Sequence, residues 1–205
     1  YKRLKPLGFI NYKFIEPELG NSKFGKEWNN VDRHLAYELS PYDTTLVMDI
    51  DYFCFTDNLL KYMDTKYDFL IPDQAHDLTH RNTFDARVWS MIPMVWATIF
   101  IFQKTYKTKM LFETVKYVKK YYTYFNNLYR IYAKNFRNDY VFAIALQQLN
   151  GFLNYDILPF KIATLPPDCK IKKFTTKGLC WQYNDQINQI EKEDVHILNK
   201  EIIHV

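Results

Sequence analysis

Glycine is scarce in this 205-residue chain, with five residues in all, and this scarcity excludes several phosphate-binding loops. No G-x-G-x-x-G pattern is present, so we expect neither a dinucleotide-binding fingerprint nor a kinase glycine loop. The segment from Gly20 to Glu27 has the G-x-x-x-x-G-K spacing of a P-loop but ends in a glutamate. A P-loop needs Ser or Thr at that position to bind Mg²⁺, and a carboxylate would repel the phosphates. We therefore interpret this segment as a surface loop.

Cysteine and long apolar runs are also sparse. The three cysteines form no C-x-x-C pair and no N-x-S/T sequon occurs, which favours a reducing compartment and predicts a cytoplasmic protein. The longest apolar run, Met91 to Phe102, is interrupted by Pro93 and Thr98. It is too short to cross a hydrocarbon core of about 30 Å, so we predict no membrane span.

The residues that are abundant indicate a globular protein with an uneven distribution of charge. Hydrophobic residues make up 48% of the chain and aromatic residues 18%, and the length favours a single domain over residues 1–205. The net charge is only +4, but the segment from Gln103 to Arg137 holds nine Lys or Arg and a single acid, Glu113. This basic block has a balance of +8, so the rest of the chain sums to −4.

Strands and helices are predicted to alternate along the chain. Apolar and β-branched runs predict strands over 9–15, 44–48, 67–71 and 94–102, and helical periodicity predicts helices over 30–39, 58–63, 109–122 and 139–149. The polar stretch 73–85 is predicted to be a loop. Alternation of this kind is typical of an α/β protein with a mostly parallel central sheet flanked by helices. We expect 44–48 to lie in the middle of that sheet, because nearly every residue in it is apolar or β-branched.

Two aspartates at the end of the 44–48 run are the strongest chemical signal. Asp49 and Asp51 lie two residues apart, so on a straight strand their side chains would share a face. Two carboxylates held together repel each other unless a cation lies between them, and their oxygens suit Mg²⁺ or Mn²⁺. The alternative is a solvated loop after a strand, since the D-x-D pattern is common.

The segment SPYDTTLVMDID, from Ser40 to Asp51, resembles the D-x-D region of nucleotide-sugar-dependent glycosyltransferases with the GT-A fold. Segments around Arg33, Asp139 and His196 follow the order in which that family carries its other functional residues. Together with FRNDYVFAIA, which begins at Phe136, the segment is most similar to phage-encoded members. The resemblance implies a GT-A-like, Rossmann-like fold. Because family members usually have more than 48 residues before the D-x-D, it also implies that part of the N-terminal nucleotide-binding unit is missing or reduced.

On the donor side, the resemblance implies a hexosyl- or pentosyltransferase that uses a UDP-sugar and Mn²⁺ or Mg²⁺. Asp49, Asp51 and His196 would bind the metal, and Arg33, Asp49 and Lys200 would bind the donor. A phage-encoded enzyme would act in the cytoplasm of the host. From the residues alone, the favoured interpretation of His196 is a hydrogen-bonded surface histidine in a strand.

On the acceptor side, the resemblance assigns Asp139 to the acceptor hydroxyl, whose proton its carboxylate would take or orient. The alternative for Asp139 is a charge that stabilises the start of a helix. The acceptor is expected to be DNA or a glycan, and the residues predicted to contact it are Asn138, Lys116, Lys119 and Lys120.

Three other interpretations stay open. The basic block interleaves its cations with tyrosines, so the chain could be a noncatalytic nucleic-acid-binding protein that uses residues 103–137. The lysines could equally form a solvated helix face. A metal-dependent phosphoryl or nucleotidyl transferase would share the aspartate pair, although a third acid is more typical of that class than a histidine.

A zinc site is a weaker alternative. His76, Asp77 and His80 imitate the H-E-x-x-H motif of zinc proteases, with Asp73 nearby. That motif needs a helix to bring both histidines onto one face. Pro72 and the polar character of this stretch favour a loop at the rim of an active site instead.

Overall fold

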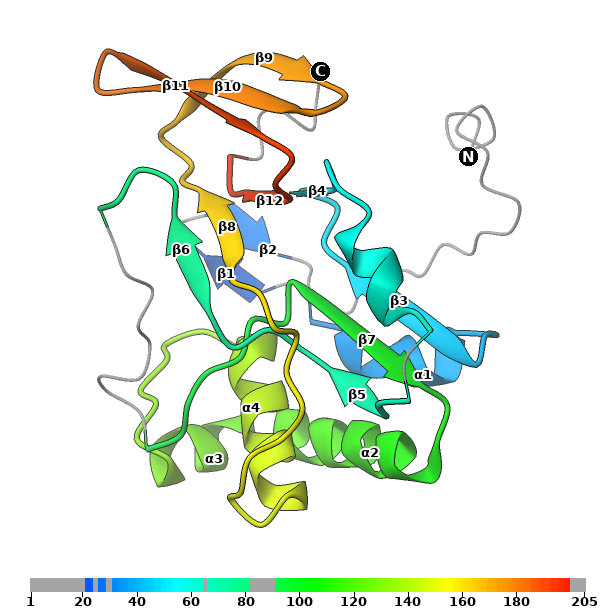
Figure 1. Cartoon of the computed structure of the whole chain (residues 1–205). Helices are drawn as coiled ribbons and strands as arrows, with labels where there is room; N and C mark the ends of the chain where they lie inside the picture. The colour runs from blue at the N-terminus through cyan, green and yellow to red at the C-terminus, as the bar shows by residue number, and fades with distance from the viewer. Residues whose placement is uncertain (1–20, 24–25, 29–30, 65, 82–90, 200–205) are drawn as a thin grey trace.

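The computed structural model describes residues 21–23, 26–28, 31–64, 66–81 and 91–199. The predicted strand over 9–15 and the predicted donor-binding residue Lys200 lie outside these ranges. In the described part, helices α2, α3 and α4 gather at one end and a three-stranded meander lies at the opposite end, with small sheets between them (Figure 1).

A three-stranded antiparallel sheet has the order β3 (Thr44–Met48), β7 (Ile99–Gln103), β5 (Phe69–Leu70). The strand predicted over 44–48 is confirmed, but its predicted place in mid-sheet is wrong, because β3 is an edge strand among the described residues. β7 takes the centre instead. Its first four residues, IFIF, are all buried, whereas β3 begins with two threonines and is only partly buried.

A four-stranded mixed sheet has the order β4 (Tyr52–Phe53), β12 (Val195–Ile197), β8 (Ile162–Leu165), β6 (Ala75–Asp77). β12 and β6 both run parallel to β8, and β4 runs antiparallel to β12. The antiparallel meander consists of β9 (Lys170–Thr175), β10 (Gly178–Tyr183) and β11 (Gln186–Glu191), and β1 (Asn21–Lys23) pairs with β2 (Lys26–Trp28).

The predicted fold class, a GT-A-like α/β fold with a mostly parallel central sheet, is therefore wrong. The described strands form several small sheets, and parallel pairing is confined to the four-stranded one. The reason lies in the order of the elements. Parallel neighbours are usually connected by a helix, but the three long helical segments follow one another without an intervening strand.

Those helices are α2 (Tyr106–Lys120), α3 (Tyr122–Leu128) and α4 (Asn138–Leu149). Shorter helical segments are η2 (Arg33–Leu35), α1 (Ala36–Leu39) and η3 (Asn58–Tyr62). The Thr105 hydroxyl accepts from the Thr108 N–H at 3.2 Å and caps α2, which begins three residues before the predicted start at 109. No helix in the described ranges has the length and apolar character needed to cross a membrane.

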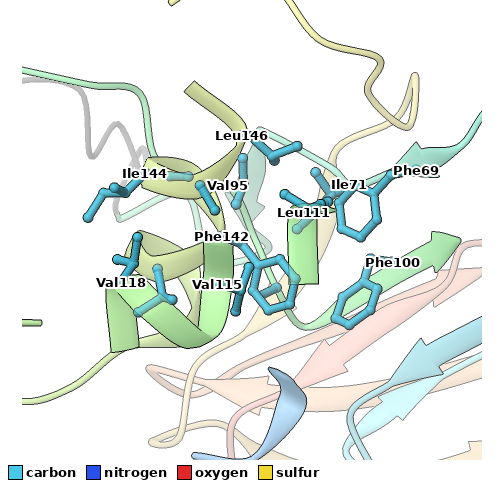
Figure 2. Packing of buried hydrophobic residues seen from close by; sticks show 14 of the residues in the cluster. Phe69, Ile71, Val95, Phe100, Leu111, Val115, Val118, Phe142, Ile144 and Leu146 are labelled. Carbon is cyan, nitrogen blue, oxygen red and sulfur yellow. The ribbon is translucent and has the colours of Figure 1, made fainter. Parts of the chain in front are cut away.

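Aromatic side chains fill the main core, where α2 and α4 cover one face of β7. The rings of Phe100 and Phe142 lie 5.0 Å apart and those of Phe102 and Phe112 lie 5.1 Å apart. Figure 2 shows the Phe142 ring between the side chains of Val115 and Phe100. This packing fixes β7, and with it Thr98 just before β7, which contacts the site described below.

Candidate metal centre

A tight turn after β3 carries the two aspartates. The Asp49 N–H donates to the Thr98 carbonyl at 2.8 Å, and the Tyr52 N–H donates back to the Asp49 carbonyl at 3.1 Å. The side chain of Ile50 is 80% exposed, whereas Asp51 is 1% exposed. The two carboxylates therefore converge through a turn and not, as predicted, through the alternation of a straight strand.

His196 reaches this turn from the other end of the chain. It lies in β12, opposite Tyr52 of β4, and is buried. Its Nε2 atom lies 3.2 Å from Asp51 Oδ1 and 3.8 Å from Asp49 Oδ2. The N–H of Ile197 donates to the Asp51 carbonyl at 2.8 Å. β12 therefore both supplies the imidazole and holds the turn that carries the aspartates.

The three side chains can act as a set of metal ligands. One atom from each of Asp49, Asp51 and His196 lies within 4.8 Å of the others, and no second group of this kind occurs in the part of the chain that the structure describes. Bringing two carboxylates together in a largely buried position is costly unless a cation compensates them. Two hard oxygen ligands and one imidazole fit Mn²⁺, and also Mg²⁺ with a less favourable third ligand.

Arg33 lies directly beside this set. Its Nη2 atom pairs with Asp49 Oδ1, so that the two oxygens of Asp49 face different partners, Arg33 on one side and His196 on the other. The Arg33 side chain is 9% exposed. The structure thus places the predicted donor-binding arginine next to the predicted metal ligands.

Thr98 contacts two of the three ligands and was not predicted from the sequence. Its carbonyl accepts the Asp49 N–H, and its hydroxyl lies 3.5 Å from Nδ1 of His196. When Nδ1 carries the proton, the Nδ1–H donates a hydrogen bond to that hydroxyl and the Nε2 lone pair faces the aspartates, as metal binding requires. The available signal was a buried polar residue that interrupts the apolar run from 91 to 102.

Asp139, the predicted catalytic residue, lies in the first turn of α4 and is 9% exposed. Its Oδ1 accepts from the Ala97 N–H at 2.9 Å, and its Oδ2 accepts from Nη2 and Nε of Arg137 at 2.7 and 3.0 Å. Burial opposes the charged form, but Arg137, with a smaller contribution from Arg33, holds the pKa of Asp139 below its ordinary value. Because Ala97 precedes Thr98, this carboxylate anchors the segment that contacts the ligands.

Two of the lysines predicted to contact an acceptor are paired with acids. Lys116 Nζ pairs with Glu38 Oε1, and Lys119 Nζ lies 3.2 Å from Asp32 Oδ1. The hydrogen bond and the charge of Lys116 lower the pKa of Glu38. These two lysines therefore attach α2 to the segment that carries Arg33.

The two other residues predicted to contact an acceptor differ from each other in exposure. Lys120 is exposed, with its Nζ 5.3 Å from the centre of the Tyr121 ring. Asn138 is 5% exposed at the start of α4. Only Lys120 is placed to meet a ligand at the surface.

The alternative zinc site is not assembled. His76 and Asp77 are consecutive in β6, so their side chains point to opposite faces, and the prediction of a loop over 73–85 is wrong for this strand. Asp77 accepts from the N–H and hydroxyl of Thr79 at 2.7 and 2.6 Å. His80 is exposed in the following turn.

Comparisons with protein-family models, with curated proteins and with solved structures returned no match for this chain.

Proposed function

We propose that the protein is a metal-dependent glycosyltransferase that moves a sugar from a nucleoside diphosphate sugar to an acceptor hydroxyl. The observation that carries this proposal is the meeting of Asp49, Asp51 and His196 from two distant parts of the chain. The resemblance of the segment from Ser40 to Asp51 to the D-x-D region of glycosyltransferases supports the choice of substrate. Acceptor hydroxyls on DNA and on glycans both fit this chemistry.

The roles of the ligating residues follow from their positions. A bound Mn²⁺ or Mg²⁺ supplies positive charge that stabilises a departing diphosphate. Asp49, Asp51 and His196 would hold it. Arg33 adds a fixed positive charge at Asp49, where its burial and its ion pair keep the guanidinium in place.

Asp139 is better suited to positioning than to proton transfer. A general base works best when its pKa is near the working pH, but the pairing with Arg137 lowers the pKa of Asp139. Its hydrogen bond to Ala97 instead fixes the backbone next to Thr98. Catalysis by Asp139 stays a prediction, and the contacts favour a supporting role.

The imidazole ligand favours glycosyl transfer over phosphoryl or nucleotidyl transfer. Sites for the latter two reactions commonly gather additional carboxylates around their metal ions. Within the described ranges the third member of the cluster is His196, not an acid.

The test is the binding of UDP to the full chain with and without Mn²⁺, measured by isothermal titration calorimetry. We expect UDP to bind at least tenfold more tightly with Mn²⁺, and Asp51→Asn to remove this dependence. Asp64→Asn, which changes an exposed acid, is the matched control and should behave as wild type. Equal UDP binding with and without metal would contradict the proposal.

Product analysis then separates the reaction classes. With UDP-glucose as the probe, transfer to water or to an acceptor releases UDP, whereas cleavage within the diphosphate releases UMP. Metal-dependent release of UMP by wild type but not by Asp51→Asn would assign the site to the competing class.

A further inference from the structure

The outer side of α2 and α3 presents a continuous stripe of exposed side chains. Tyr117, Tyr121, Tyr124 and Leu128 follow one another at steps of four, three and four residues, which places them on one side of a helix. Hydrogen bonds from the Tyr121 N–H to Tyr117 and from the Phe125 N–H to Tyr121, both 3.2 Å, continue the helical pattern through the junction. The four side chains are 43% to 63% exposed. We call them the tyrosine stripe.

The turn after α3 carries two exposed cations and another exposed tyrosine. Arg130, Tyr132 and Lys134 are exposed, whereas Ile131 is 7% exposed and Ala133 is half-buried. Because the buried residues alternate with the exposed ones, anchoring Ile131 in the core turns its charged and aromatic neighbours outward.

This turn is held in a defined shape. The side-chain amide of Asn126 donates to the Ala133 carbonyl at 3.1 Å and accepts from the Ala133 N–H at 3.0 Å. The Ile131 N–H donates to the Asn126 carbonyl at 2.9 Å. Arg130 and Tyr132 have φ values of 52° and 56°, a conformation that costs energy for residues other than glycine. A surface that is already ordered loses little entropy when it binds a ligand.

The charge of this surface is of one sign. The sequence holds no Asp or Glu between Thr114 and Asn138. Lys120, Arg130 and Lys134 take part in none of the ion pairs found among the described residues, in contrast to the lysines on the opposite flank of α2. Among the described residues, the surface therefore combines aromatic rings with cations that form no ion pair with an acid.

We propose that the tyrosine stripe and the turn that follows it bind a single-stranded nucleic acid. Aromatic rings give sequence-tolerant stacking platforms for bases, and cations neutralise the phosphates. The unpaired charge favours this ligand over a neutral glycan. It also disfavours a second copy of the chain, whose identical cations would repel. The proposal is independent of the metal centre.

The test uses the full chain and a fluorescein-labelled, mixed-sequence single-stranded DNA of about 20 nucleotides, with binding followed by fluorescence anisotropy. Three phosphate contacts predict a slope of about −2 for log affinity against log salt concentration. The combined variant Lys120→Gln, Arg130→Gln, Lys134→Gln should bring this slope close to zero and weaken binding at least tenfold at 50 mM salt. A parallel titration with RNA of the same sequence distinguishes the two nucleic acids.

A matched control removes the same charge from the beginning of the basic block. Lys104→Gln, Lys107→Gln, Lys109→Gln should keep the wild-type slope and bind within about twofold of wild type. All variants are compared for melting temperature, so that misfolding is recognised. Equal losses in the two combined variants, or no binding by wild type at 50 mM salt, would overturn the proposal.

Substitution of single tyrosines tests whether the aromatic rings stack on bases. Tyr117→Leu and Tyr124→Leu keep an apolar side chain but remove the ring, and each should weaken binding roughly tenfold without changing the salt slope. Concentration-dependent dimerisation in sedimentation velocity, lost in these variants and without oligonucleotide binding, would instead identify a contact between copies and overturn the proposal.

Discussion

The metal centre and the basic block differ in how their charged side chains are arranged. The metal centre gathers two like charges, Asp49 and Asp51, in a largely buried position. In the basic block, five of the nine cations pair with acids; these are Lys107, Lys109, Lys116, Lys119 and Arg137. Two carboxylates with one arginine, Arg33, still leave a net negative charge that a bound metal would offset, whereas ion pairs between opposite charges are explained by folding alone. A high local net charge therefore identifies a functional surface only where the structure leaves it unpaired.

The largest effect on stability is expected at Arg137. This residue of the basic block pairs with Asp139, whose carboxylate holds the segment next to the metal centre. Arg137→Met would leave the buried Asp139 carboxylate without its counter-charge, at a cost of about 3–5 kcal/mol in the free energy of unfolding. Urea denaturation at pH 7 measures this loss. Arg130→Met, which changes an exposed arginine, is the control and should stay within about 0.5 kcal/mol of wild type.

The pH dependence of this stability difference shows whether the ion pair between Arg137 and Asp139 causes it. The folded-state pKa of Asp139 lies below its ordinary value of 3.8, so its ion pair stabilises the protein above that value. The stabilisation is lost as the pH falls through the folded-state pKa. The difference between wild type and Arg137→Met should therefore shrink below about pH 4. A difference that is the same at pH 7 and pH 3 would argue against the ion pair as its origin.

The next effect concerns the choice of metal at the centre. His196→Asn replaces an imidazole by an oxygen ligand, which should weaken Mn²⁺ binding about a hundredfold but change Mg²⁺ binding much less. Competition titrations with both ions measure the ratio. His80→Asn, at an exposed histidine outside the cluster, should leave both affinities unchanged. Unchanged affinities for both ions would mean that the imidazole does not bind metal, and equal losses would mean that it does not select Mn²⁺ over Mg²⁺.

The sequence predicts an element of secondary structure correctly where a local pattern of residues determines that element. The helices around 109–122 and 139–149 and the strand over 44–48 are present, because apolar periodicity and the stop at Asn150 and Gly151 act locally. Sheet order depends on pairing between distant strands. β12 lies beside β8 and β4, and no spacing within any of these strands predicts this arrangement.

The same distinction applies to the site. The Asp49–Asp51 pair was evident because both residues end one apolar run, and the resemblance added His196. Thr98 and Arg137 were missed because their roles depend on contacts that the fold creates. Lys116 and Lys119 were assigned to an acceptor because they belong to the basic block. Their ion pairs could not be foreseen, since the acidic partners are 78 and 87 residues away in the sequence.

A smaller effect at the metal centre tests the supporting role of Thr98. Thr98→Val removes the hydroxyl that faces His196 and should weaken Mn²⁺ binding about tenfold, because partners of metal-bound histidines orient the ring. Thr98→Ser should restore most of the affinity. Thr164→Val, at a buried threonine opposite His196 in β8, is the control. Calorimetry with Mn²⁺ measures the affinities, and Ser and Val variants that bind Mn²⁺ equally well would rule out the hydroxyl contact.

The smallest expected effect is on stability, and it shows whether a lysine of α2 stabilises the fold through an ion pair or binds a ligand. Lys119→Gln breaks a partly buried ion pair with Asp32 and should cost about 1 kcal/mol in the free energy of unfolding. Lys116→Gln should cost about 0.3 kcal/mol, because its partner Glu38 is exposed and solvent screens the pair. Neither change should alter Mn²⁺ affinity or the salt slope of oligonucleotide binding. Unchanged stability with a flatter salt slope would return both lysines to the ligand-binding surface, because a cation that binds phosphate is not required to stabilise the fold.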